Sequence, residues 1–130
     1  MSEQFLKQWL IKADNDLTVA RHELSLPEVD RVTEAICFHC QQAAEKYLKA
    51  FLISRNQEIG KTHNLEYLRE RCAQYVERFR ALDLGDLTSY AVEVRYPDDF
   101  FIPSMEEAEK SLTITERIRA FVLGLIEKQE

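Results

Sequence analysis

Apolar residues recur every three or four positions over most of the chain, which is the spacing of amphipathic helices. In the N-terminal segment this spacing predicts a first helix that is capped by Ser2 and ends at about Leu24. Pro27 breaks the pattern. A second helix is expected from its cap, Asp30, to about Ser54. The first helix has its apolar positions at Leu6, Trp9, Ala13, Leu17, Ala20 and Leu24.

Two further helices are expected in the middle of the chain. Polar residues followed by Gly60 predict a loop over residues 55–62. A third helix then begins near His63, and a shorter fourth helix covers Asp83 to about Glu93. The third helix carries its apolar residues at Leu65, Leu68, Cys72, Tyr75 and Phe79.

A last helix follows residues 95–103, which two prolines keep out of helical conformation. Ser104 and Glu107 have the spacing of a capping box, and the helix should extend to about Lys128. Short connections between long amphipathic helices favour antiparallel neighbours. We therefore expect an all-α fold, an antiparallel up-down bundle of four to five helices, with a single domain over residues 1–130.

Charge and composition limit the functional classes. The net charge of −6 argues against general nucleic-acid binding, which needs a basic surface, but it allows a local cationic pocket. No apolar run approaches the roughly 20 residues that span a bilayer, so we expect no membrane association. The N-terminus lacks the layout of a signal peptide. Together with an odd number of cysteines, three, these features predict a cytoplasmic protein with reduced thiols.

The predicted second helix has two distinct faces. Its apolar face contains Ile36, Cys40, Ala43, Tyr47 and Phe51. A neighbouring polar face can contact an anion, and it contains His39, Gln42, Lys46 and Lys49.

Each of these polar residues also has a structural interpretation. His39 lies beside the apolar face, where the pattern favours a half-buried, hydrogen-bonded histidine over a catalytic one. Glu45 and Lys49 have the spacing of an i,i+4 ion pair, which leaves Lys46 and Gln42 freer to bind a ligand.

Cys37 and Cys40 form a CxxC motif, but no second pair of ligands at zinc-site spacing accompanies it. Cysteines within an apolar helix face are ordinarily core residues. We expect neither a metal nor another cofactor.

Three segments together resemble the HEPN domain family: residues 42–50 (QAAEKYLKA), residues 62–65 (THNL) and residues 95–97 (RYP). Trp9, Ala13 and Asp16 in the first helix add to the resemblance, which covers nearly the whole chain. It implies a dimeric bundle of four or five helices. Many relatives are encoded beside a small nucleotidyltransferase, as in toxin–antitoxin pairs.

Several branches of this family are metal-independent ribonucleases. Their motif has an Arg and a His separated by four to six intervening residues, and two copies meet across a dimer interface. The Arg would stabilise the charge on the phosphorus centre, and the His would act as acid or base for attack by a 2′-hydroxyl.

This chain departs from that motif. Arg95 matches the Arg, but residues 96–102 contain no histidine. Arg55 and His63 have seven intervening residues and lie in the wrong part of the family pattern. His39 or His63 could supply the imidazole from another helix.

Three of the candidate residues have alternative roles. Arg95 can simply complement a helix dipole, and His63 can satisfy free amides at a helix start. Tyr96 is either a packing residue or a modifiable hydroxyl, since some relatives are adenylylated on a tyrosine near this motif. The apolar residues 100–102 either tuck under the bundle or dock on a second subunit.

Our leading hypothesis is a HEPN homodimer that pairs with a nucleotidyltransferase and holds a nucleotide or RNA phosphate. The alternative is a metal-independent endoribonuclease toxin that uses Arg95 with His63 or His39. A plain helical scaffold without a ligand is a third hypothesis. The candidate phosphate-binding residues are Gln42, Lys46, Lys49, His63, Arg95 and Tyr96.

Overall fold

The computed structural model describes residues 3–91 and 102–128. This part of the chain contains no strand, and the expected all-α helical bundle is confirmed. Its α-helices are α1 (Glu3–Leu24), α2 (Thr33–Ser54), α3 (Leu65–Ala73) and α4 (Met105–Glu127). Three 3-10 helices accompany them: η1 (Glu28–Asp30), η2 (Glu77–Ala81) and η3 (Leu87–Tyr90). No helix within residues 3–91 and 102–128 is long and apolar enough to cross a membrane.

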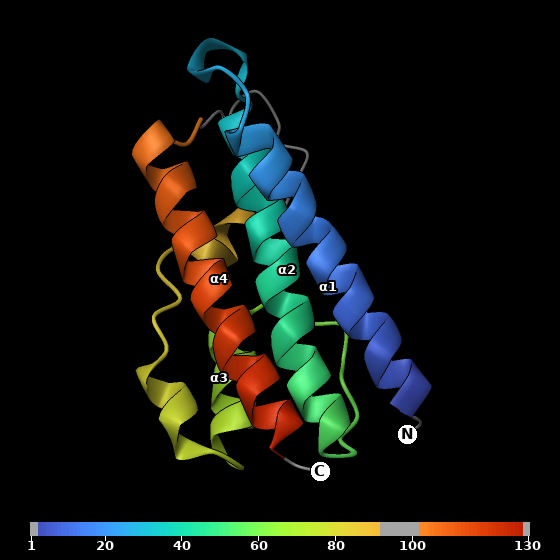
Figure 1. Cartoon of the computed structure of the whole chain (residues 1–130). Coiled ribbons are helices and arrows are strands. Elements are labelled where there is room, and N and C mark those ends of the chain that lie inside the picture. Colours follow the sequence, from blue (N-terminus) through green and yellow to red (C-terminus); the bar gives the residue numbers. More distant parts are fainter. Residues whose placement is uncertain (1–2, 92–101, 129–130) are drawn as a thin grey trace.

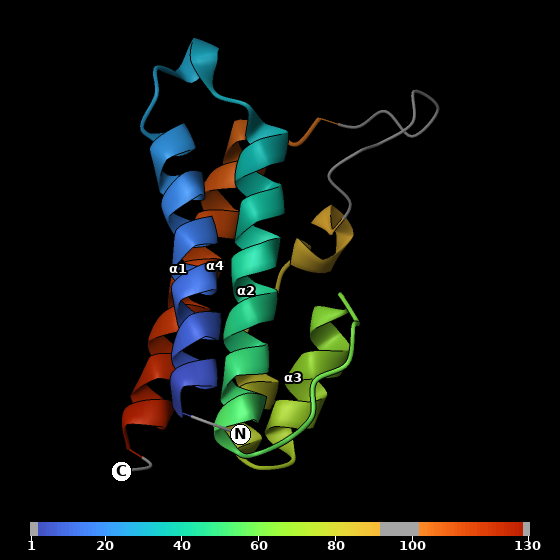
Figure 2. The ribbon, with the colours of Figure 1, turned by 90° about the vertical axis from the view of Figure 1, so that its right-hand side faces the viewer.

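Helix α2 lies at the centre of the molecule, because 14 of its 22 residues are buried. Helices α1 and α4 pack along it, and α3 and η3 cover another side (Figures 1 and 2). The core is continuous from α2 to α4 through an aromatic chain: the ring of Phe79 lies 4.7 Å from that of Phe51 and 4.9 Å from that of Phe121.

Helix α1 is antiparallel to α2, as expected, but α2 and α4 run in the same direction (Figure 1). Their N-termini lie together: Thr33 Oγ1 donates a hydrogen bond to the Pro103 carbonyl at 2.7 Å, and an Arg31 nitrogen lies 3.4 Å from Met105 Sδ. Between them, segments 55–64 and 82–86 consist of turns and irregular structure rather than helix.

The long helices end close to the predicted positions. Helix α1 ends at Leu24 and α2 at Ser54. The predicted capping box of α4 is present, with Ser104 Oγ accepting from the Glu107 amide at 3.0 Å and Glu107 Oε1 accepting from the Ser104 amide at 3.1 Å. Ser2 lies outside the described residues.

Two predicted helix boundaries are wrong. Asp30 lies in η1, and the residue before α2 is Val32, whose amide donates to Glu23 at 3.0 Å. Helix α3 ends at Ala73, and the chain turns into η2 so that Phe79 reaches the core.

The predicted fourth helix from Asp83 is also wrong over the described residues, where only η3 is helical. Gly85 has a φ of +51°, which a right-handed helix does not allow, and the Asp83 carboxylate accepts a hydrogen bond from its amide at 2.8 Å. Residues 92 and 93 lie outside the described residues. Of the apolar residues 100–102, only Ile102 is described, and it is exposed.

Candidate functional site

The polar face of α2 contributes to two separate clusters. The first, which we call the Asp16 cluster, joins α1 to α2. Asp16 Oδ1 lies 2.9 Å from His39 Nδ1, and Asp16 Oδ2 accepts from Lys46 Nζ. The side chains of His39 and Lys46 are 25% and 22% exposed. The interpretation of His39 as a half-buried, hydrogen-bonded residue is therefore confirmed.

Lys46 and Gln42 are less available than the sequence suggests. Lys46 is ion-paired with Asp16, and Gln42 Nε2 donates to Gln41 Oε1 at 2.7 Å. The pattern along α2 alone could not show this, because Asp16 reaches Lys46 from another helix, 30 positions away in the chain.

The second cluster surrounds the buried Glu45 carboxylate, and we call it the Glu45 network. Glu45 accepts hydrogen bonds from Lys49 Nζ at 2.9 Å and from Gln41 Nε2 at 3.2 Å, and its Oε1 lies 2.8 Å from His63 Nδ1. The predicted pair of Glu45 and Lys49 is confirmed. Both residues are only 4% exposed, and Lys49 Nζ also lies 5.9 Å from the centroid of the Trp9 ring.

The Glu45 network is fully satisfied, as a buried ionic cluster must be to be tolerated. No buried side-chain nitrogen or oxygen in the described part of the chain lacks a hydrogen-bond partner. Lys49 therefore serves to balance the charge of Glu45 and does not present its ammonium group to solvent.

His63 is the exposed end of this network. Its side chain is 62% exposed, although Nδ1 is bound to Glu45 and its backbone carbonyl accepts from Gln41 Nε2 at 3.3 Å. It does not cap α3, because Asn64 does so by accepting from the Tyr67 amide at 2.9 Å. No described residue hydrogen-bonds to Nε2 of His63.

The partner of Nδ1 determines what Nε2 can do. An ionised Glu45 holds the ring proton on Nδ1, so Nε2 accepts a hydrogen bond in the neutral imidazole and donates one in the protonated form. His63 is the one exposed residue among the described candidates, which are His39, Gln42, Lys46, Lys49 and His63. Arg95 and Tyr96 lie outside the described residues, so their proximity to His63 stays a prediction.

A third polar cluster, which the sequence analysis missed, joins α1, α2 and α4. Asp14 accepts a hydrogen bond from the buried Tyr47 hydroxyl, and Arg119 Nε donates to Asp14 Oδ1 at 2.9 Å. Burial and the contact with Asp14 raise the pKa of Tyr47 above its usual value. The only sequence signal was a tyrosine on the apolar face of α2, whose hydroxyl must find a partner when buried.

The cysteines are core residues, as expected from their helix face. All three are buried and free. Burial raises the pKa of Cys37 to about 11 and those of Cys40 and Cys72 to about 12, so the thiols stay protonated near neutral pH. Within residues 3–91 and 102–128, no three His, Cys, Asp or Glu side chains are grouped so that they could hold a metal ion.

A comparison with models of protein families finds a match. The model of the HEPN domain matches residues 6–127, which is nearly the entire chain. No curated protein and no solved structure matches the chain. The match begins in the first turn of α1 and extends to the end of α4, and it contains the Glu45 network and His63. The chain therefore belongs to the HEPN domain family.

Proposed function

We propose that this HEPN protein binds a nucleotide or RNA phosphate at His63, and that it acts as a homodimer together with a nucleotidyltransferase. One observation carries the choice of His63. The exposed imidazole is held at Nδ1 by a carboxylate that is itself 4% exposed.

The buried carboxylate fixes the orientation of the exposed ring. Desolvating Glu45 is unfavourable by several kcal/mol before Lys49 and Gln41 compensate for it. In its protonated form His63 can donate a charge-assisted hydrogen bond from Nε2 to a phosphate oxygen. Lys61, exposed two residues earlier, adds a positive charge to the same segment.

The net charge of −6 favours a local contact with one or two phosphates over an extended nucleic-acid interface. Binding of AMP, ATP and a short single-stranded RNA by the purified protein tests this. We expect His63→Gln to abolish binding and His39→Gln to retain it, because His39 makes the same Nδ1–carboxylate contact but is only 25% exposed. Unchanged binding by His63→Gln would contradict the proposal.

The partner and the dimer rest on family membership. Co-expression with a nucleotidyltransferase encoded beside this chain should yield a complex that survives gel filtration. Light scattering of the chain alone should give the mass of a homodimer. Two separate, non-interacting proteins, or a monomer at micromolar concentration, would refute these parts of the proposal without affecting the phosphate site.

The same geometry favours a second candidate function, a metal-independent endoribonuclease. A carboxylate bound to Nδ1 with Nε2 exposed is the arrangement in which an imidazole acts as a general base, here on a 2′-hydroxyl. Arg95 would stabilise the developing charge on the phosphate.

Incubation with cellular RNA in chelator-containing buffer separates the two functions. If the protein is an endoribonuclease, the unaltered chain and the His39→Gln variant should cleave the RNA. The His63→Gln and Arg95→Ala variants should not. If the unaltered chain leaves the RNA intact, the endoribonuclease function is refuted and phosphate binding without cleavage is retained.

A further inference from the structure

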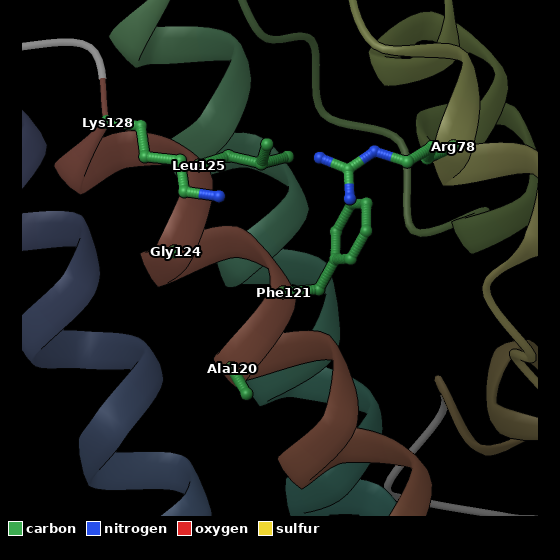
Figure 3. A pocket seen from close by; sticks show the side chains of 6 residues that line it. All are labelled: Arg78, Ala120, Phe121, Gly124, Leu125 and Lys128. Atoms are coloured by element: carbon green, nitrogen blue, oxygen red, sulfur yellow. The ribbon is translucent and has the colours of Figure 1, made fainter.

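A concave site lies at the other end of the molecule from η1, between η2 and the last two turns of α4 (Figure 3). Its volume is about 180 Å³, and it shares no residue with the Glu45 network. Figure 3 shows Arg78 extending from η2 toward α4, while Leu125 and Lys128 extend from α4. The lining residues are Arg78, Ala120, Phe121, Gly124, Leu125 and Lys128.

The charges around this pocket favour an anionic ligand. Arg78 lies over the ring of Phe121, with its guanidinium carbon 5.4 Å from the ring centroid. Arg80, on the same 3-10 helix, is ion-paired with Glu70 at 2.8 Å and Glu77 at 3.5 Å. By contrast, no ion pair within the described part of the chain involves Arg78 or Lys128.

Gly124 contributes to the concave shape of the site. A glycine inside a helix is unfavourable by about 1 kcal/mol relative to alanine. Close packing commonly explains such a glycine, but a Cβ built on Gly124 would meet no atom within 4 Å. The helix therefore carries a residue that its packing does not require, and the missing side chain leaves the pocket open.

The size of the pocket limits the ligand. Sites that enclose drug-sized molecules usually measure at least roughly 300 Å³, so this open concavity of about 180 Å³ can enclose only part of a nucleotide. Base stacking on Phe121 is also blocked, because Arg78 covers its ring and Phe79 packs against it. A single amino-acid residue is a better match, with its side chain against Ala120 and Leu125 and a negative group beside the two cations.

We propose that this pocket binds the C-terminal residue of a partner protein, an apolar residue whose α-carboxylate contacts Arg78 and Lys128. A chain terminus joins an apolar side chain and a carboxylate within one residue, which is the combination that a pocket of this size and charge can hold. Capture of a C-terminal carboxylate is an established mode of peptide recognition. The site is independent of phosphate binding at His63.

NMR titration of the full chain with the pentapeptide Gly-Ser-Gly-Ser-Leu tests the ligand class. We expect the free-acid peptide to shift the amide resonances of Gly124 and Leu125. The C-terminal amide should bind at least about tenfold more weakly, since it lacks the charge. Inorganic phosphate and 4-methylpentanoate, a free acid with a similar apolar group, should bind more weakly than the peptide acid. Equal binding of the amide, or tighter binding of either small anion, would overturn the proposal.

Substitutions at the pocket test its location. Gly124→Leu should fill the pocket without destabilising α4, because nothing lies within 4 Å of the added Cβ and leucine favours helix. It should abolish peptide binding, and Arg78→Gln should weaken binding about tenfold. Arg80→Gln is the matched control, because Arg80 lies on the same 3-10 helix but outside the pocket. Retained binding in a folded Gly124→Leu variant, verified by circular dichroism, would refute the assignment.

Discussion

Replacing Glu45 by glutamine should destabilise the protein strongly, because it leaves Lys49 as an uncompensated buried charge. Both residues are 4% exposed, and Lys49 Nζ has Glu45 as its one hydrogen-bond partner among the described residues. Breaking such a buried pair from one side costs about 3–5 kcal/mol. Glutamine keeps one acceptor oxygen, so we expect the lower end, about 3 kcal/mol of the free energy of unfolding.

This loss is large relative to a typical domain stability of about 5–15 kcal/mol. In a chain of this size it corresponds to a fall in Tm of roughly 10–15 °C. Urea denaturation followed by circular dichroism measures the free energy of unfolding directly. The control is Glu70→Gln, which breaks an exposed pair with Arg80 and should change stability much less.

A double variant tests the cause of the effect. If the buried charge of Lys49 is responsible, Glu45→Gln combined with Lys49→Met should recover at least about 2 kcal/mol, since an apolar side chain needs no counter-charge. A loss below about 1 kcal/mol in the single variant, or no recovery in the double variant, would refute the view that the two residues form a buried, mutually dependent pair.

Three further predictions concern the core and the helix termini. Because burial raises the pKa of Cys40 to about 12, the buried thiols should not react with a disulfide reagent at pH 8 until the protein is unfolded; rapid reaction of the native protein would contradict this. Burial and Asp14 raise the pKa of Tyr47, so the folded state favours the neutral phenol. Its contribution to stability should be complete below pH 10, the value for an unfolded tyrosine, and should be lost as the pH rises further, whereas a Tyr47→Phe variant should lose less stability over the same range. Ser104→Ala should cost about 1 kcal/mol in urea denaturation, because the capping box of α4 is lost, and an unchanged midpoint would contradict that role.

The parts of the fold that could be predicted depend on local signals. The apolar period and the capping box at Ser104 gave the course of α1, α2 and α4, since each signal lies within the element that it defines. Helix α3 was predicted too long because the apolar spacing continues from Cys72 to Phe79. Phe79 does pack in the core, but through a 3-10 helix after a turn. The spacing of apolar residues along the sequence does not reveal such a change in the backbone conformation.

The candidate site shows the same limit over longer distances. The residues that share the polar face of α2 were identified correctly, but their partners come from elsewhere. Asp16 lies 23 positions from His39, and His63 lies 18 positions from Glu45. Which carboxylate pairs with which imidazole depends on how α1 and the segment before α3 pack on α2. A periodic pattern cannot supply that information.

The most direct test of the phosphate site is the side-chain nitrogen NMR spectrum of His63 in the unaltered protein, recorded while AMP or a short RNA is added. We expect the ring proton on Nδ1 before addition, because Glu45 lies 2.8 Å away, and a large shift of the Nε2 resonance as the ligand binds. His39 should change little. Saturable binding that leaves Nε2 of His63 unshifted would show that the phosphate binds elsewhere and would contradict the central proposal.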